Sequence, residues 1–418
     1  MLANNPSKQT KHIERDFSNI LKYKEKKSIR DLNVRNKQVL VRVDYNVPLD
    51  EKGKITDSRR IKNTIPTLNY LLDQNCSIVL ISHLGRPGGK IVESLRMNPV
   101  HEKLKEFFPG VNILKTDDCI GEEVQNEAKN LKEREMLLLE NPRFHIEEKK
   151  NDLDFAEKLS RLADVYIDDA FATAHRKQAS TYGICSFFEE KGFGFLVEKE
   201  LEFLSSCIEQ PQRPFTVILG GKKVKDKLGV IKYLIGLADN IIVGGGMAYT
   251  FFLAKGYQIG RSVKDLSKVE EIKEYLKDDT HETKIYIPKD ILVCDDIDDP
   301  KMIKSVPISD IGENDIGVDI GTETIDAFKK ILSQSKQVVW NGPMGIFEKK
   351  EFEKGTKEIA KFLVENEIFT IIGGGDSAAA IEKFNLQDGV AFISTGGGAS
   401  LDIMKGSLLP AIDCLSDK

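Results

Sequence analysis

The sequence predicts an α/β protein in which two units each contain a parallel sheet covered by helices on both faces. Short apolar runs rich in β-branched residues alternate with segments of helical periodicity in the first half, and the second half repeats this order. Such alternation is typical of parallel sheets, because a crossover between parallel strands usually contains a helix. The chain of 418 residues is also too long for a single hydrophobic core, so at least two domains are expected.

The composition is that of an ordinary soluble globular protein, with 40% hydrophobic and 30% charged residues. The net charge of -5 gives no basic excess, so nucleic acid is not expected as a partner. No apolar run is long enough to cross a bilayer, so no membrane partner is expected either. The six cysteines show no C-x-x-C pair and no metal-binding spacing, which indicates reduced thiols in a cytoplasmic protein.

Residues 1–26 form a polar segment without the apolar stretch of a secretory signal. Its acidic residues Glu14, Asp16 and Glu25 also argue against a transit peptide. We expect a loosely ordered extension before the first domain.

The first domain is predicted to cover residues 27–193. Its strands are expected at residues 38–44, 76–82, 136–140 and 165–168, and helices at residues 61–71 and 153–162. The apolar residues of the earlier helix recur at the spacing of one helical face.

Residues 194–213 are predicted to link the domains, because Gly194–Ile208 has the pattern of an amphipathic helix and is followed by Pro211 and Pro214. The second domain is predicted to cover residues 214–405. Its strands are expected at residues 215–219, 241–243, 338–340, 369–372 and 391–393, and each ends in glycine-rich or Asn-Gly sequence. In such sheets ligands bind at the carboxyl ends of the strands, where these turns fall.

The stretch Thr216–Lys227 combines an apolar strand, a glycine pair and four lysines within six residues. Glycines let the backbone approach an anion, and the start of a helix adds unpaired N–H groups and a partial positive charge. The stretch therefore indicates a phosphate site. The alternative is a solvated lysine run that opens a surface helix.

Arginines and histidines gather in the loops of the first domain. They accompany an aspartate and an asparagine at the expected strand ends, and the set is Arg42, Asp44, Asn46, Arg60, His83, Arg86, Arg143, His175 and Arg176. The planar guanidinium binds carboxylate and phosphate through two parallel hydrogen bonds, so the set predicts a pocket for a small polyanion. Any one of these arginines alone would be interpreted as a surface ion pair, and either histidine alone as a hydrogen-bonding group. Their recurrence in four separate loops favours the pocket.

Three glycine triplets follow expected strands of the second domain, at residues 244–246, 373–375 and 396–398. Their backbone N–H groups could hold the phosphates of a nucleotide. Asp376 is a candidate ligand of a phosphate-bound Mg²⁺, which typically takes one or two protein carboxylates. No P-loop motif is present. Gly373-x-Gly375-x-x-Ala378 fits a loose dinucleotide fingerprint, but no acidic residue follows at the usual distance of about 20 residues.

Eight motifs carry a resemblance to a known family. They are V-R-V-D-Y-N-V-P, S-H-L-G-R-P, D-A-F-A-T-A-H-R, G-G-K-K-V-K-D-K, G-G-G-M-A, W-N-G-P-M-G-I-F-E, G-G-G-D-S and S-T-G-G-G-A-S. In this order, from about Lys27 to about Pro410, they are similar to the motifs of phosphoglycerate kinase. The resemblance covers nearly the whole chain.

The resemblance implies two doubly wound parallel-sheet (Rossmann-like) domains that face each other across a cleft and are joined by a hinge helix. It also implies that residues 406–418 return to the first domain as a tail. A monomer is the expectation for the family.

The resemblance further implies a role for each matching position. Phosphoglycerate would be bound by Asp44, Asn46, Arg60, His83, Arg86, Arg143 and Arg176, with His175 nearby. The nucleotide would be bound by Lys223 and Lys227 at the phosphates, Gly245 near the base, Asn341 on the phosphate side, Glu348 at the ribose, and Asp376 with Ser377 at the metal and phosphates. Gly374, Gly375, Gly397 and Gly398 would direct N–H groups toward the transferred phosphoryl group. The catalytic set would be Arg60, Lys223, Lys227, Gly375 and Gly398.

The implied reaction is the glycolytic, Mg²⁺-dependent transfer 1,3-bisphosphoglycerate + ADP = 3-phosphoglycerate + ATP, by direct in-line transfer after hinge closure. Mg²⁺ is the implied cofactor, and ATP or ADP is the co-substrate. In the reverse direction the acceptor is a carboxylate that is already ionised, so no general base is needed. This agrees with the lack of a convincing Ser-His-Asp or paired-carboxylate arrangement in the sequence.

Some positions depart from the family pattern. Asp168 and Ala172 stand where Asn and Gly are usual, Lys222 where Ala is usual, Ser377 where Thr is usual, Phe392 where His is usual, and Ala411 where Gly is usual. No charged site residue is lost, so the departures bear on the rate and not on the type of reaction.

Two other functions are alternatives to this kinase. A dinucleotide-dependent oxidoreductase would use the loose fingerprint at Gly373, but it leaves the lysines and arginines without a role. A non-catalytic nucleotide- or anion-binding protein is expected to have lost some of Arg60, Lys223, Lys227 and Asp376, and all four are present.

Overall fold

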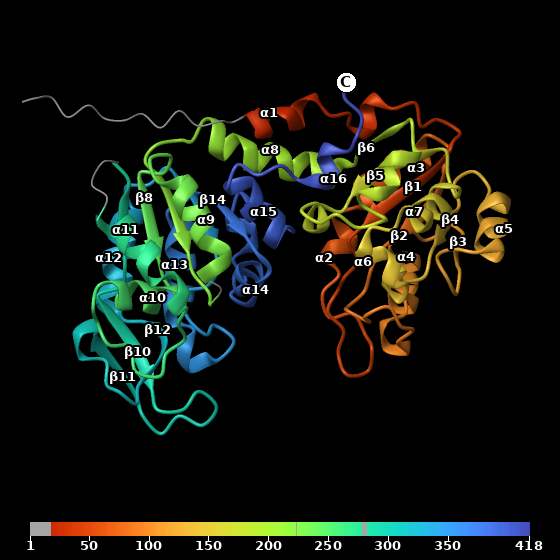
Figure 1. Ribbon diagram of the computed structural model, residues 1–418. Helices are drawn as coiled ribbons and strands as arrows, with labels where there is room; N and C mark the ends of the chain where they lie inside the picture. The colour runs from red at the N-terminus through yellow and green to blue at the C-terminus, as the bar shows by residue number, and fades with distance from the viewer. Residues whose placement is uncertain (1–17, 223, 278–281) are drawn as a thin grey trace, which may run out of the picture. The chain divides into compact units, whose positions relative to one another are not determined.

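The computed structural model describes residues 18–418 except residues 223 and 278–281. Its chain divides into two compact units (Figure 1). The N-terminal unit contains residues 18–202 and 407–418, and the C-terminal unit contains residues 203–406.

The N-terminal unit is built on a six-stranded parallel sheet. The strands are β1 (Gln38–Val43), β2 (Ser77–Ile81), β3 (Ile113–Lys115), β4 (Met136–Leu138), β5 (Val165–Asp169) and β6 (Lys191–Phe193), in the order β3-β4-β2-β1-β5-β6. The residues of β2, β4 and β5 are all buried, as expected for a parallel sheet with both faces covered. The four strands predicted for this unit are confirmed, and β3 and β6 were not predicted.

Helices separate most of the strands of this unit, and two further helices lie near the ends of the chain (Figure 1). They are α1 (Ser18–Glu25), α2 (Arg59–Lys62), α3 (Ile65–Asp73), α4 (Asn98–Phe107), α5 (Glu122–Asn130), α6 (Ile146–Lys150), α7 (Leu153–Ser160) and α16 (Pro410–Asp413). The single helix predicted for residues 61–71 is in fact split between α2 and α3. Pro66 lies in the first turn of α3, where its missing N–H is tolerated, and it could not continue a preceding helix.

Helix α1 is held by the C-terminal residues of the chain. The Tyr23 hydroxyl donates to the Ser407 carbonyl oxygen at 3.0 Å and accepts from the Leu409 N–H at 2.7 Å. Lys26 Nζ donates to the Asp413 carbonyl oxygen at 2.7 Å. Residues 18–25 are therefore helical, although the sequence predicted a loosely ordered extension through residue 26. The rest of that extension, residues 1–17, lies outside the described residues.

Helix α8 (Phe195–Glu209) carries the chain from one unit to the other, and it matches the predicted amphipathic helix. Its first turn is capped by side chains from elsewhere in the N-terminal unit. Asp169 Oδ1 accepts from the N–H groups of Leu196 and Val197, and Thr67 Oγ1 accepts from the N–H of Phe195. These bonds satisfy N–H groups that the start of a helix leaves without internal partners.

The C-terminal unit contains a second six-stranded parallel sheet and a small antiparallel sheet. The parallel strands are β7 (Phe215–Leu219), β8 (Asn240–Val243), β9 (Lys284–Tyr286), β13 (Gln337–Asn341), β14 (Phe369–Gly373) and β15 (Phe392–Ile393), in the order β15-β14-β13-β7-β8-β9. The antiparallel strands are β10 (Asp290–Cys294), β11 (Ile303–Pro307) and β12 (Ile316–Ile320), in the order β11-β10-β12. The five predicted strands are confirmed, whereas β9 and the small sheet were not predicted.

The helices of the C-terminal unit follow the strands in the same alternation. They are α9 (Val224–Leu234), α10 (Met247–Ala254), α11 (Val269–Lys277), α12 (Thr322–Leu332), α13 (Lys354–Glu365), α14 (Gly375–Lys383) and α15 (Gly397–Met404). Each predicted glycine triplet lies between a strand and a helix: β8 and α10, β14 and α14, and β15 and α15.

In both parallel sheets the first strand is central, the next strands in the chain lie on one side of it, and the last strands lie on the other side. The reversal falls between β1 and β5 in one sheet and between β7 and β13 in the other. Ligands in doubly wound sheets bind beyond the carboxyl ends of the strands at this reversal. The topology therefore marks one candidate edge in each unit.

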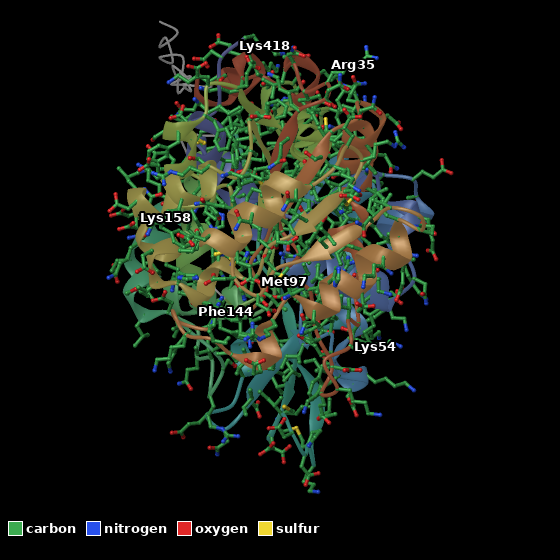
Figure 2. The ribbon with its side chains drawn as sticks, turned by 90° about the vertical axis from the view of Figure 1, so that its right-hand side faces the viewer. Arg35, Lys54, Met97, Phe144, Lys158 and Lys418 are labelled. Atoms are coloured by element: carbon green, nitrogen blue, oxygen red, sulfur yellow. The ribbon has the colours of Figure 1, made fainter. Side chains whose placement is uncertain are left out.

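Side chains are sorted by polarity around the N-terminal unit. Figure 2 shows Arg35, Lys54 and Lys158 directed away from the ribbon, and all three are exposed. Met97 lies inside, where its side chain is fully buried.

Asp319 is a buried carboxyl group in β12 of the C-terminal unit. Its Oδ2 accepts from the Gly355 N–H at 2.5 Å, and its Oδ1 has no hydrogen-bond partner among the described residues. Burial raises the pKa of Asp319 to about 7, although the Gly355 N–H acts in the opposite direction. The folded protein therefore retains a proton here at pH values where the unfolded chain has lost it.

The free energy of unfolding of the C-terminal unit is expected to fall between pH 5 and pH 8. We expect this fall to be smaller in the Asp319→Asn variant. Since the folded pKa lies above the unfolded one, the stabilising contribution is fully present below about pH 4 and is lost as pH rises through about 7. The loss reaches about 1.4 kcal/mol per pH unit between the two pKa values. Urea unfolding can be followed by Trp340, the single tryptophan, which is buried in this unit. Equal pH dependence in both proteins would contradict the assignment.

Candidate active site

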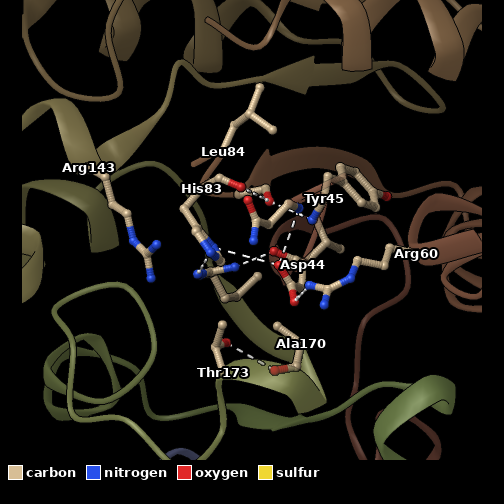
Figure 3. A network of polar contacts seen from close by, with 12 residues as sticks. Asp44, Tyr45, Arg60, His83, Leu84, Arg143, Ala170 and Thr173 are labelled. Atoms are coloured by element: carbon tan, nitrogen blue, oxygen red, sulfur yellow. Dashed lines mark hydrogen bonds and ion pairs between the residues drawn. The ribbon is translucent and has the colours of Figure 1, made fainter. Parts of the chain in front are cut away.

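A group of basic side chains lies at the carboxyl edge of the N-terminal sheet, beside the reversal between β1 and β5 (Figure 3). We call it the basic cluster, and its members are Arg42, Arg60, His83, Arg143 and Arg176, with Asp44 as their acidic neighbour. Asp44 follows β1 and forms an ion pair with Arg60 of α2. His83 follows β2, and its Nδ1 lies 3.7 Å from Asp44 Oδ1. Strands that are adjacent in the sheet thus deliver these groups to one place.

Arg42 is the fully buried member of the cluster. Its Nε donates to Ser180 Oγ at 2.9 Å, and its Nη2 lies 3.3 Å from His83 Nδ1. Ser180 in turn donates its hydroxyl proton to the buried Glu148 at 2.7 Å. Arg42 was predicted to be one of the arginines of the pocket, but its contacts make it a support for His83. Ser180 and Glu148 were not identified from sequence, because neither is part of a motif.

His83 is a neutral imidazole in this setting. Its side chain is 2% exposed, and burial is the first cause that lowers its pKa well below the ordinary value. The positive charges of Arg42, Arg143 and Arg176 act in the same direction. A neutral imidazole can still donate or accept a hydrogen bond with a bound anion without adding charge.

Arg143 and Arg176 complete the cluster. Burial, followed by repulsion from Arg42 and Arg176, lowers the pKa of Arg143 to about 10. Arg143 Nη1 donates to the Gly85 carbonyl oxygen at 2.9 Å, and its Nε has no hydrogen-bond partner among the described residues. Burial also lowers the pKa of Arg176, whereas Asp44 raises it. Crowded, partly buried guanidinium groups of this kind are suited to a polyanion, which would relieve their repulsion.

The other predicted residues of this site lie in the same loops. Asn46 accepts a hydrogen bond through Oδ1 from the Gly85 N–H at 2.8 Å, so its amide joins the loops after β1 and β2. Arg86 is exposed and makes no hydrogen bond or ion pair with the described residues. His175 accepts through Nε2 from Arg176 Nε at 3.1 Å.

Lys227 lies at the second reversal, between β7 and β13 of the C-terminal unit. Its Nζ donates to the carbonyl oxygens of Gly220 and Asn341, which follow or end these two strands, at 2.5 and 3.0 Å. The side chain is 7% exposed. The ammonium group therefore sits at the carboxyl edge of the sheet, within reach of an anion that binds there. Lys223, its predicted companion, lies outside the described residues.

Asn341 and Ser377 both lie close to the second glycine triplet. Asn341 is buried, and its Nδ2 has no hydrogen-bond partner among the described residues. That amide faces Gly374, because a Cβ built on Gly374 would lie 3.3 Å from Nδ2. Ser377 Oγ accepts from the Gly342 N–H at 2.6 Å, so the hydroxyl remains able to donate.

The N-termini of α14 and α15 lie side by side. A Cβ built on Gly397 would lie 3.8 Å from Gly374 Cα and 4.0 Å from Gly375 N, and the preceding strands β14 and β15 are neighbours. A Cβ on Gly375 would meet no atom within 4 Å, so the space beside its Cα is open. Gly398 follows in the first turn of α15. Two adjacent helix N-termini with bare backbone form a binding site for anionic groups.

Asp376 is the exposed carboxylate in the first turn of α14. It makes no hydrogen bond or ion pair within the described part of the chain. One unengaged carboxylate beside a phosphate site fits Mg²⁺, which usually binds one or two carboxylates, phosphate oxygens and water.

Gly245 and Glu348 lie farther along the same edge. Gly245 has φ +57°, and a Cβ there would lie 2.4 Å from Gly221 N, so a side chain would collide with the loop after β7. The Glu348 carbonyl oxygen accepts from Lys383 Nζ at 3.2 Å, at the far end of α14 from Gly375. Those helix ends are about 12 Å apart at the usual rise per residue. Glu348 is thus placed away from the glycine N–H groups.

Comparison with known proteins decides the family. The family model described as phosphoglycerate kinase matches residues 29–407. The chain belongs to the phosphoglycerate kinase family. It is therefore a kinase, and the oxidoreductase considered from the Gly373 fingerprint is excluded.

Individual members of the family agree over most of their length. Phosphoglycerate kinase of Finegoldia magna is 45% identical over 395 residues, which cover 94% of this chain and 100% of the relative. The structure of phosphoglycerate kinase from Coxiella burnetii has a TM-score of 0.79 at 34% identity, and covers 93% of this chain and 98% of its own. That from Pyrococcus horikoshii has a TM-score of 0.81 at 33% identity with the same coverage. Among the described residues, no helix has the length and apolar character needed to cross a membrane.

The structure shows the contacts of two residues that depart from the phosphoglycerate kinase pattern. The Asp168 side chain is buried beside Arg42, and its Oδ1 accepts a hydrogen bond from the Ala170 N–H at 2.9 Å. Burial raises the pKa of Asp168 to about 6. Phe392 stacks on Phe203 of α8, with ring centroids 4.5 Å apart and an interplanar angle of 7°. The hydrogen bond and the ring contact show how each replacement is accommodated.

Proposed function

We propose that this kinase catalyses the reversible, Mg²⁺-dependent transfer of a phosphoryl group between 1,3-bisphosphoglycerate and ADP, giving 3-phosphoglycerate and ATP. The observation that carries the proposal is the basic cluster, in which burial and mutual repulsion lower the pKa values of Arg143 and Arg176 and positive charge is in excess beside Asp44. A substrate with a carboxylate and a phosphate matches that excess of positive charge.

The phosphoglycerate is bound at the edge of the N-terminal sheet. Its anionic groups take hydrogen bonds from Arg86, Arg143 and Arg176, and its hydroxyl contacts Asp44 and Asn46. His83 donates as a neutral group, and His175 orients Arg176. The unpartnered Nε of Arg143 supports this arrangement, because a buried N–H needs an acceptor.

The nucleotide is bound at the edge of the C-terminal sheet. Gly245 lies near the base, and Glu348 accepts from the ribose hydroxyls. Asn341 Nδ2 and Ser377 Oγ donate to phosphate oxygens, together with Lys223 and Lys227. Helix α14 is roughly 12 Å long from Gly375 to Lys383, whose Nζ contacts the Glu348 carbonyl oxygen, and this length is compatible with the distance from ribose to terminal phosphate.

Mg²⁺ would be held by Asp376 and would neutralise part of the charge on the nucleotide phosphates. The unengaged carboxylate of Asp376 beside the bare N–H of Gly375 supports this fit.

The chemistry proceeds by direct in-line transfer. The acceptor carboxylate is already ionised, so the residues position the reactants and stabilise charge instead of removing a proton. Arg60, Lys223 and Lys227 stabilise the charge of the transferred group, and the N–H groups of Gly375 and Gly398 face its oxygens. Since the two substrates bind to different units, transfer requires the units to close about α8, which also excludes water from the acyl phosphate.

We further propose that the enzyme acts as a cytoplasmic monomer in glycolysis. All six cysteines are free, and five of them are buried, which supports a reducing compartment.

The product provides the test of this reaction. The purified chain is incubated with ATP, Mg²⁺ and 3-phosphoglycerate, and hydroxylamine traps any acyl phosphate as a hydroxamate. We expect hydroxamate in proportion to the ADP formed. ADP formation without hydroxamate would show a different acceptor and contradict the proposal.

A further inference from the structure

Three side chains with metal-binding atoms meet at the outer end of the N-terminal sheet, away from the reversal between β1 and β5. Asp118 and Cys119 follow β3, and His145 follows β4. Strands β3 and β4 are parallel neighbours, so the loops after them lie at the same edge. The Asp118 carbonyl oxygen accepts from Thr116 Oγ1 at 2.7 Å and from the Glu140 N–H at 3.4 Å, which ties the two loops together.

The three side chains point toward one another. One ligand atom from each of Asp118, Cys119 and His145 lies within 4.8 Å of the other two. His145 Nε2 lies 2.7 Å from Asp118 Oδ1, and the imidazole packs on the Phe155 ring at a centroid distance of 5.2 Å. The fold therefore holds the three donors close together, although their spacing in the sequence matches no recognised metal-binding motif.

The arrangement is closed on one side and open on the other. The Cys119 side chain is fully buried, so it lies on the interior side of the three donors. The Asp118 and His145 side chains are 51% and 27% exposed, so an ion can reach the donors from solvent. Asp118, Glu147 and Glu148 provide the negative charge nearby, and Lys158 is the opposing cation that acts on His145.

A nucleophilic role for the thiol is not supported. Burial raises the pKa of Cys119 well above its ordinary value, and the carboxylates of Asp118 and Glu148 act in the same direction. A reactive cysteine instead needs positive surroundings and some exposure.

We propose that Asp118, Cys119 and His145 bind a divalent transition-metal ion of the zinc type. One sulfur, one imidazole nitrogen and one carboxylate oxygen form a donor set that Zn²⁺ prefers, whereas Mg²⁺ takes oxygen ligands. Three protein ligands leave one tetrahedral position for water on the exposed side. Because His145 is two residues from Arg143, the ion would also fix the loop that carries this arginine.

The site is tested with Co²⁺, which replaces Zn²⁺ and has a visible spectrum. The full-length protein is first stripped of metal with a chelator and then titrated with Co²⁺ under anaerobic conditions. We expect one equivalent to give a thiolate-to-cobalt charge-transfer band, which Zn²⁺ removes and excess Mg²⁺ does not. No such band in the wild-type protein would overturn the proposal.

Variants separate this site from other cysteines. Cys119→Ser should abolish the band, and His145→Gln, at a partly exposed position, should weaken Co²⁺ binding on the order of 100-fold. Cys76→Ser is the matched control, since Cys76 is equally buried in the same unit but donates to the Val34 carbonyl oxygen. A band that survives in His145→Gln with unchanged affinity would mean that Asp118 and His145 form an ion pair only.

Discussion

Lys227→Ala is expected to lower turnover by about 100- to 1000-fold while changing the dissociation constant for ADP much less. Removing one preorganised charge-stabilising donor typically has an effect of that size. In the structure Lys227 Nζ is held by two carbonyl oxygens at the reversal between β7 and β13, so its position is set before any ligand arrives. An ammonium group fixed there would act on the charge that develops during transfer more than on ground-state binding.

The matched control for this change is Lys232→Ala, an exposed lysine on the same helix α9. It should leave turnover unaltered. Lys227→Met retains most of the packing volume and separates the loss of charge from a loss of fold, which Trp340 fluorescence can monitor. Near-normal turnover of a folded Lys227→Ala protein would contradict the catalytic role.

Arg60→Ala is expected to reduce turnover by about 100-fold, whereas Arg86→Ala should mainly raise the KM for 3-phosphoglycerate, by about tenfold. Arg60 is fixed by its ion pair with Asp44, and a fixed cation is suited to transition-state charge. Arg86 is exposed and unpaired among the described residues, so it is suited to initial binding of the anion.

The two arginines are compared by steady-state kinetics with 3-phosphoglycerate as the varied substrate. Arg59→Ala is the control, because Arg59 neighbours Arg60 on α2 but its guanidinium bonds to Asp57. It should change neither constant by more than about twofold. If Arg60→Ala altered only the KM and Arg86→Ala only turnover, the two roles would have been assigned in reverse.

The central strands could be predicted because they are continuous apolar runs. Ser77–Ile81 and Phe215–Leu219 are buried throughout and contain one polar residue each, and such runs are recognisable without knowledge of the fold. Strand β11 could not be predicted in this way, because four of its five residues are exposed and it is ordered by its antiparallel pairing with β10. The break between α2 and α3 was missed because helical spacing continued across it.

The loops that carry the site were predictable from the rule that parallel strands end at one edge, which brings Asp44 and His83 together. The direction of each side chain was not. The sequence could not show that Arg42 donates a hydrogen bond to Ser180, nor that Lys227 donates to two carbonyl oxygens. Arg42 and Ser180 are 138 positions apart and Lys227 and Asn341 are 114 positions apart, so the local sequence pattern contains no signal for these contacts.

The most direct test of the account is a coupled assay of the full-length chain. ATP, Mg²⁺ and 3-phosphoglycerate are supplied, and a dehydrogenase that consumes NADH reports the acyl phosphate. We predict NADH oxidation that requires all three components and stops when any one is omitted. Unchanged oxidation without Mg²⁺ or without 3-phosphoglycerate, or none with all three present, would contradict the account.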